Sequence, residues 1–181
     1  MSETAQDWSG DVHRALADAA VRQVAYVPDA GLSGLIEACR ADAAMAAVLL
    51  TSEEEGVALL AGAWLGGQRG ALLMQSSGIG NCINMLSLTR VCRLPLLIVA
   101  TMRGEDGETN PWQVPMGRNA RALLECTGVE VRRADAPGDI AGLVAEAAHA
   151  AFASDHQHPA AQAVLIGQAV VGVKSFEDQA S

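Results

Sequence analysis

The chain has 181 residues, of which 50% are apolar and 18% charged, and this composition suits one globular domain with a packed core. Twelve basic against 21 acidic residues give a net charge of −9, which disfavours nucleic acid and anionic membrane surfaces as partners. The polar, acidic start has no secretory signal pattern, and no stretch is long and apolar enough to cross a membrane. We therefore expect a soluble, cytoplasmic protein.

Short apolar runs bounded by turn residues alternate along the chain with segments of helical periodicity. The runs predict strands at residues 23–27, 46–51, 70–75, 94–101, 129–133 and 161–166. The periodic segments predict helices at residues 10–22, 31–41, 52–66, 79–92, 117–126 and 137–153. Strands separated by helices need crossover connections, which place helices on both faces of a mostly parallel sheet. We therefore predict a three-layer α/β/α fold in one domain over residues 1–181, with an ordered core at about residues 10–170.

Ligands of such sheets bind beyond the carboxyl ends of the strands, so the strand-to-helix turns are the places to search for chemistry. The polar turns are residues 28–31, 52–56, 75–81 and 102–117.

The second of these turns opens a helix with three carboxylates, Glu53, Glu54 and Glu55. Carboxylates in a first helical turn stabilise the positive end of the helix dipole, so a solvated helix start explains them without any function. At about 100° per residue, Glu53 and Glu54 lean toward apolar side chains of the helix, whereas Glu55 points outward. A carboxylate that faces an apolar interior needs a partner, which is how functional carboxylates are often made, so either of the two is a candidate.

Residues 75–81 place two glycines and several polar side chains where a strand becomes a helix, which allows a ligand to approach the backbone closely. The segment lacks the lysine of a phosphate-binding loop and the third glycine of a dinucleotide motif, so a plain tight turn fits it equally well. In the long fourth turn, Arg103 and Arg118 are candidates to bind an anion, and a solvated surface loop is the alternative.

No metal site is predicted in this chain. The four cysteines are isolated, and the histidines do not fall on the ligand-side turns. We expect reduced thiols that mostly fill the core.

Three blocks, residues 51–57, 74–81 and 103–117, resemble a known pattern when they are taken together. They resemble the thiamine diphosphate-dependent 2-oxo acid decarboxylases that comprise the sulfopyruvate decarboxylase alpha subunits and the phosphonopyruvate decarboxylases. The resemblance implies a pyrimidine-binding domain with a six-stranded parallel sheet of strand order 2-1-3-4-6-5. It also implies that the cofactor lies between this domain and a separate diphosphate-binding domain.

In this family a glutamate at the start of the helix after the second strand contacts the N1′ atom of the aminopyrimidine, ten residues before an aromatic side chain. That register, with Trp64 as the aromatic residue, selects Glu54 as the catalytic and cofactor-binding glutamate. A carboxyl group bonded to N1′ favours the tautomer whose 4′-nitrogen can take a proton. The resemblance implies further cofactor-binding residues, namely Gln75, Ser76, Ser77, Gly78 and Asn81. Candidate substrate-binding residues are Asp29, Arg103 and Arg118.

The chain lacks the Gly-Asp-Gly segment, followed some distance later by Asn, that holds Mg²⁺ against the diphosphate in these enzymes. We therefore expect Mg²⁺ to be held by a beta subunit, and activity only in a hetero-oligomer. Glu53 stands where many relatives in the wider superfamily have a histidine. The expected reaction is decarboxylation of sulfopyruvate to sulfoacetaldehyde. The alternatives are a phosphonopyruvate decarboxylase subunit and a non-catalytic protein that keeps the thiamine fold.

Overall fold

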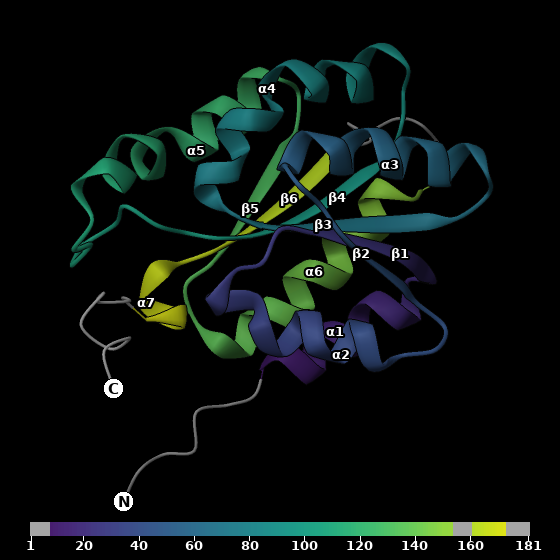
Figure 1. The fold of residues 1–181 in the computed structure, drawn as a ribbon, viewed down its shortest axis with the longest axis horizontal. Helices are drawn as coiled ribbons and strands as arrows, with labels where there is room; N and C mark the ends of the chain where they lie inside the picture. Colours follow the sequence, from purple (N-terminus) through teal and green to yellow (C-terminus); the bar gives the residue numbers. More distant parts are fainter. Residues whose placement is uncertain (1–7, 154–160, 173–181) are drawn as a thin grey trace, which may run out of the picture.

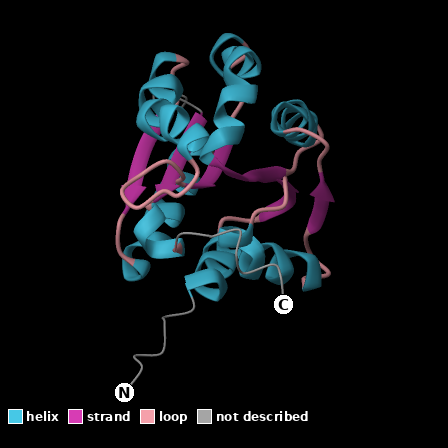
Figure 2. Ribbon diagram, turned by 60° about the vertical axis from the view of Figure 1, so that its left-hand side comes forward, coloured by secondary structure: helices cyan, strands magenta, loops and turns pink. Residues whose placement is uncertain are grey.

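The computed structural model describes residues 8–153 and 161–172, and it contains a six-stranded parallel sheet between two layers of helices (Figures 1 and 2). The strand order is β2-β1-β3-β4-β6-β5, which confirms the predicted topology. The strands are β1 (Val21–Tyr26), β2 (Ala46–Leu49), β3 (Arg69–Gln75), β4 (Leu96–Thr101), β5 (Glu130–Ala134) and β6 (Ala161–Ile166).

One face of the sheet is covered by α1 (Trp8–Asp18), α2 (Ser33–Ala41) and α6 (Pro137–Ala151). The other face is covered by α3 (Glu53–Leu65), α4 (Ser76–Val91) and α5 (Val114–Cys126). Short helical turns complete the described chain: η1 (Ala30–Leu32), η2 (Pro111–Gln113) and α7 (Gln168–Val171).

The sheet separates two apolar cores, because successive strand side chains point to opposite faces. All six residues of β4 are buried, as a central strand with helices on both sides requires. The parallel register brings the carboxyl ends of all strands to one edge. The polar turns predicted to carry chemistry therefore share that edge.

Every predicted strand is present, but some element bounds were wrong. The helix predicted at residues 10–22 ends at Asp18, and Val21 and Arg22 belong to β1. Two helix starts were wrong by about one turn. Helix α4 begins at Ser76, directly after β3, rather than at Ile79. Helix α5 begins at Val114 and is preceded by η2, so the fourth turn is shorter than predicted. Serine, glycine and proline favour turns when only the local sequence is considered, whereas here they form first helical turns packed against neighbouring elements.

The cysteines divide between the core and the surface. Cys39 and Cys82 fill the core, but Cys92 and Cys126 are exposed, so core filling was correct for only two of the four free thiols. Within residues 8–153 and 161–172, no helix is long and apolar enough to span a bilayer. Of the four histidines, for which no metal site was predicted, His156 and His158 lie outside the described residues.

Candidate functional site

The first turn of α3 separates the three adjacent glutamates into different environments. Glu53 is buried, with 6% of its surface exposed, and shares the inward side of the helix with Gly56, Val57 and Leu60. Glu54 is half-buried at the rim of the sheet edge, and Glu55 is exposed. The sequence left both Glu53 and Glu54 as candidates, and the structure shows that Glu53 is the carboxylate turned into the interior.

The half-buried Glu54 is held as an ionised acceptor. The hydroxyl of Ser52, the N-cap residue of α3, donates to Glu54 Oε2. This bond is the largest cause that lowers the pKa of Glu54 below its ordinary value, followed by a bond from its own backbone N–H. Glu55 instead accepts a bond of 2.9 Å from the backbone N–H of Thr51, which closes the helix start. Glu54 is therefore available as a charged hydrogen-bond acceptor at neutral pH.

The first turn of α4 packs directly against Glu53. A Cβ placed on Gly78 would lie 2.4 Å from Glu53 Oε1, so only glycine allows this approach. The side-chain Nδ2 of Asn81 donates to Glu53 Oε2 at 2.8 Å. Cys82 also lies beneath this turn: burial raises the pKa of its thiol to about 12, and the charges of Glu53 and Glu54 contribute in the same direction.

The predicted cofactor-binding residues of this turn do not all face outward. Ser76 is fully buried, and its Oγ accepts a hydrogen bond of 2.9 Å from the backbone N–H of Arg103. Gln75 and Ser77 are half-buried, and Asn81 is exposed. Ser76 and Gly78 thus form the inner wall of the turn, while the other three side chains lie closer to solvent.

Two of the three predicted substrate-binding residues pair with each other. Arg103 Nη2 donates to Asp29 Oδ1 at 3.0 Å, and the side chains are only 10% and 5% exposed. The Thr101 hydroxyl donates to Asp29 Oδ2 at 2.7 Å, so both carboxylate oxygens are bonded. Arg103 Nη1 is buried without a hydrogen-bond partner among the described residues. This buried pair joins the turns after β1 and β4.

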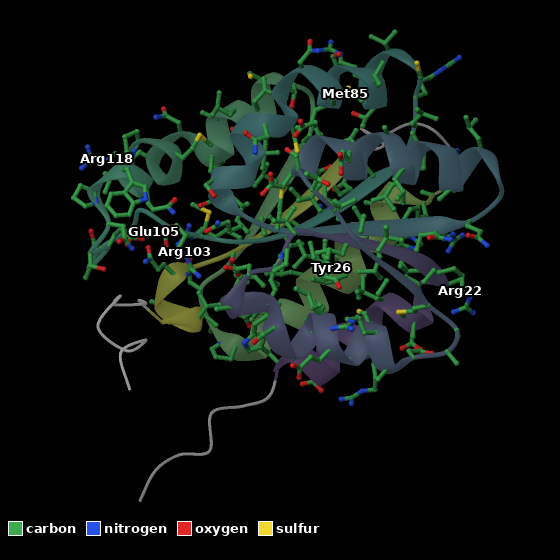
Figure 3. All side chains as sticks on the ribbon, viewed as in Figure 1. Arg22, Tyr26, Met85, Arg103, Glu105 and Arg118 are labelled. Carbon is green, nitrogen blue, oxygen red and sulfur yellow. The ribbon has the colours of Figure 1, made fainter. Side chains whose placement is uncertain are left out.

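Arg118 lies apart from that pair, on α5, where it is exposed (Figure 3). It lines a surface hollow of about 610 Å³ together with Arg133 and the loop from Gly104 to Glu108. Figure 3 shows Arg103, Glu105 and Arg118 at the same end of the molecule, opposite Arg22. This end of the molecule therefore carries one exposed guanidinium, that of Arg118, and one buried guanidinium, that of Arg103.

A hydrogen-bond network that the sequence did not reveal shapes the loop beside this hollow. The carboxylate of Glu108 accepts bonds from the backbone N–H groups of Gly104 and Asn110 and from Gln168 Nε2, at 2.9–3.0 Å. Burial raises the pKa of Glu108, but these bonds outweigh burial and lower it overall. Glu105 binds the Arg133 guanidinium and the backbone N–H of Gln168. These hydrogen bonds connect the loop of residues 104–110 to β5 and α7.

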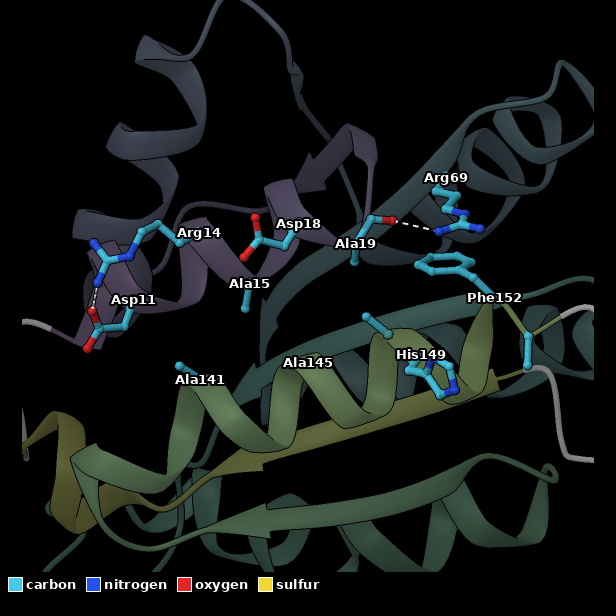
Figure 4. A pocket seen from close by; sticks show the side chains of 12 residues that line it. Asp11, Arg14, Ala15, Asp18, Ala19, Arg69, Ala141, Ala145, His149 and Phe152 are labelled. Atoms are coloured by element: carbon cyan, nitrogen blue, oxygen red, sulfur yellow. Dashed lines mark hydrogen bonds and ion pairs between the residues drawn. The ribbon is translucent and has the colours of Figure 1, made fainter.

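A larger hollow than this one lies elsewhere, between α1 and α6 (Figure 4). Its volume is about 910 Å³, and several of its lining residues are alanines. The Arg69 guanidinium lies 5.3 Å from the centre of the Phe152 ring and donates to Ala19 O. This hollow belongs to the helical layer opposite α3 and α4, so it is separate from the glutamates.

Comparison with known families matches residues 9–120 to the thiamine pyrophosphate enzyme, N-terminal TPP binding domain. The chain belongs to this thiamine pyrophosphate enzyme family. Thiamine pyrophosphate is the same compound as thiamine diphosphate.

The relatives of this family member include sulfopyruvate decarboxylase alpha subunits. The subunit from Methanococcus maripaludis is 36% identical over 137 residues, which cover 75% of this chain and 82% of the relative. The subunit from Methanothermobacter thermautotrophicus is 35% identical over 141 residues, covering 77% and 86%. The phosphonopyruvate decarboxylase of Streptomyces viridochromogenes is 38% identical over 124 residues, which cover 67% of this chain but 31% of that protein.

A solved structure, the 2-oxoglutarate:ferredoxin oxidoreductase from Magnetococcus marinus, superimposes with a TM-score of 0.67. It is 12% identical, and the match covers 94% of this chain and 31% of that chain. This similarity supports the fold of the thiamine pyrophosphate enzyme domain.

The residues at the sheet edge suit the aminopyrimidine end of thiamine pyrophosphate. Glu54 offers a charged acceptor, and Gln75, Ser77 and Asn81, after β3 at the same sheet edge, carry amides and a hydroxyl, groups that can bind the nitrogens of a heterocycle. Among the described residues, no group of three or more His, Cys, Asp or Glu side chains lies close enough together to hold a metal ion.

Proposed function

We propose that the chain is the alpha subunit of a thiamine diphosphate-dependent decarboxylase that converts sulfopyruvate into sulfoacetaldehyde and CO2. The observation that carries this proposal is Glu54, an ionised, half-buried carboxylate at the start of α3 in the register of the family motif. The similarity to sulfopyruvate decarboxylase alpha subunits over about three quarters of the chain supports the substrate class.

The proposed roles follow from the chemistry of each side chain. When bound, thiamine diphosphate supplies the electron sink that decarboxylation of a 2-oxo acid needs. Glu54 accepts the hydrogen bond at N1′ of the pyrimidine, and Gln75, Ser77 and Asn81 contact the pyrimidine and the substrate. Ser76 and Gly78 keep the wall of the turn in place through their contacts with Arg103 and Glu53.

A beta subunit is proposed to hold the diphosphate and Mg²⁺. The outward sides of α3 and α4 support such a partner, because they carry apolar side chains although both helices lie in an outer layer. Leu65 and Val91 are 79% and 78% exposed, and Leu88 is 38% exposed. Apolar helices at a surface usually mark a protein interface.

A cytoplasmic location and a single domain over residues 1–181 stay predictions of the sequence.

The subunit requirement gives a direct test. Purified chain with thiamine diphosphate and Mg²⁺ is expected to release no CO2 from sulfopyruvate, because it lacks the groups for the diphosphate. Addition of a beta subunit of a sulfopyruvate decarboxylase is expected to produce sulfoacetaldehyde, measured with a coupled aldehyde dehydrogenase. Full activity of the chain alone would contradict the proposed division of the cofactor site, and an inactive complex that binds cofactor would favour a non-catalytic role.

Phosphonopyruvate is the second candidate substrate, because phosphonopyruvate decarboxylases of two Streptomyces species are 38% identical to parts of this chain. Both acids carry a tetrahedral anionic group, so the same guanidinium can bind either. Initial rates of the reconstituted complex with the two acids side by side decide between them. Faster release of phosphonoacetaldehyde than of sulfoacetaldehyde would make phosphonopyruvate the preferred substrate.

The substrate anion is proposed to bind Arg118, while the buried Asp29–Arg103 pair supports the turn beside it. Both carboxylate oxygens of Asp29 accept hydrogen bonds, and Arg103 is buried. Arg118 is therefore the more accessible of the two arginines. Replacement of Arg118 by Ala is expected to raise KM about 10–100-fold with a smaller change in kcat, since one charge-assisted contact is lost. Steady-state kinetics of the reconstituted complex measure this change.

Arg14 provides the matched control for that variant, because it is an exposed arginine on α1, in the opposite helical layer. Arg14→Ala is expected to leave KM unchanged. An unchanged KM in Arg118→Ala would assign the substrate anion to other groups.

A further inference from the structure

Glu53 differs from its two neighbours in that its carboxylate is buried and carries a specific partner. Only 6% of its surface is exposed, and its Oε2 accepts the amide of Asn81 at 2.8 Å. Burial of a carboxylate is costly unless hydrogen bonds and favourable charges compensate. The family register assigns the cofactor contact to Glu54, so the buried glutamate needs a separate explanation.

Glu53 lies where the starts of two helices meet. The residue is the first of α3, and its Oε1 lies against Gly78 in the first turn of α4. The carboxylate therefore lies beside the first turns of both α3 and α4. Glu53 Oε2 is the acceptor in this contact, so it binds the Nδ2 group of Asn81 and not its oxygen.

This contact fixes the orientation of an exposed amide. The side-chain amide of asparagine is planar, with its nitrogen and oxygen on opposite sides of the same carbon. Because Nδ2 of Asn81 is bonded to the interior, Oδ1 is directed away from Glu53. Asn81 lies on the exposed side of the α4 start, so the group it offers to a ligand is a hydrogen-bond acceptor.

We infer that Glu53 is a positioning residue, which holds Asn81 so that its side-chain oxygen accepts a hydrogen bond from an amino group of the bound pyrimidine. The inference rests on the proposed function, because it requires an aminopyrimidine at this edge. Glu53 and Glu54 then have distinct roles: the buried carboxylate orients a neutral acceptor, and the rim carboxylate binds the ring nitrogen.

The first test reads the Glu53–Asn81 bond without cofactor or partner. In the ¹⁵N-labelled full chain, one Nδ2 proton of Asn81 is expected to be shifted downfield and slow to exchange. The signal is assigned by its loss in Asn81→Asp. Glu53→Met keeps the side-chain length but removes the acceptor, and is expected to abolish the shift.

Two glycine variants provide a matched pair that leaves Glu53 itself in place. Gly78→Ala forces the Glu53 carboxylate to move, because the new Cβ would lie 2.4 Å from Oε1. Gly80→Ala adds the same methyl group two residues later, where Met116 Sδ, at 3.4 Å, is the one atom within 4 Å among the described residues outside the helix's own backbone. The Asn81 signal is expected to change in Gly78→Ala and to persist in Gly80→Ala. An unchanged signal in both Glu53→Met and Gly78→Ala would overturn the inference.

The second test uses the complex reconstituted with a beta subunit. Glu53→Met and Asn81→Ala are each expected to lower kcat about tenfold and to weaken thiamine diphosphate binding, read by tryptophan fluorescence. The double variant is expected to lose no more kcat or cofactor affinity than either single variant, since both changes remove the same Glu53–Asn81 contact. Glu53→Gln is expected to restore much of the loss, because its amide oxygen can accept from Asn81.

The outcomes separate this inference from the proposed function. If Glu54→Gln is inactive while Glu53→Met and Asn81→Ala bind cofactor and turn over as the wild type does, the positioning role is refuted and the proposed function stands. If Glu54→Gln is fully active, the proposed function fails and the role of the Asn81 oxygen fails with it. Additive losses in the double variant would also refute a shared role.

Discussion

Replacement of Glu54 by Gln is expected to lower kcat of the reconstituted decarboxylase by about 10²–10⁴-fold. The variant keeps the shape of the side chain but removes the ionised oxygen, which the Ser52 hydroxyl otherwise holds in its charged form. An amide cannot exchange a proton with N1′ as a carboxyl group can, so the acid–base function is lost while most binding contacts stay. Turnover of sulfopyruvate at saturating cofactor measures the effect.

Glu55 supplies the control for this variant, because it is adjacent, carries the same charge and also stands in the first turn of α3. Its carboxylate accepts from the backbone N–H of Thr51, a bond that an amide oxygen can also make. Glu55→Gln is therefore expected to retain wild-type turnover. Equal losses in both variants would indicate that the charge of the helix start matters and not a specific contact of Glu54.

Replacement of Arg103 by Met is expected to lower the free energy of unfolding by about 3–5 kcal/mol, because it leaves the Asp29 carboxylate buried with an uncompensated charge. The Arg103 and Asp29 side chains are 10% and 5% exposed, so water cannot replace the lost partner. Denaturation of the isolated chain by urea measures the change, with circular dichroism as the signal.

The double variant Asp29→Leu with Arg103→Met distinguishes a buried pair from general damage at this position. Removal of both charges is expected to recover much of the lost stability, since apolar side chains often replace a buried ion pair at little cost. Arg14→Met removes one member of an exposed pair with Asp11 and is expected to change the stability little. A double variant as unstable as Arg103→Met would contradict the uncompensated charge as the cause.

The sheet was predictable because its signals are local. Strands such as Leu96–Thr101 are short apolar runs, and regular alternation with helices favours parallel pairing. The start of α4 was not predictable in this way. Serines and glycines resemble a turn in sequence, and the reason for Gly78 is a contact with Glu53, which lies 25 residues earlier in the chain.

Helical periodicity narrowed the candidates for an inward-facing carboxylate from three glutamates to Glu53 and Glu54. It did not show which of these two is buried, because adjacent positions differ by only about 100° around a helix. The family register selects Glu54, which stays a prediction of function. Packing of α3 against the sheet and α4 decided that Glu53 is the buried one.

The amino-acid sequence by itself determined the α/β class, the parallel sheet and the family, since these depend on periodic patterns and short motifs. Only the tertiary structure decided the partners of the charged groups. The Asp29–Arg103 pair and the Glu53–Asn81 bond join residues 74 and 28 positions apart, and their formation depends on how the strand ends meet at one edge. Local sequence carries no information about such distant contacts, because folding brings these side chains together only after the sheet has formed.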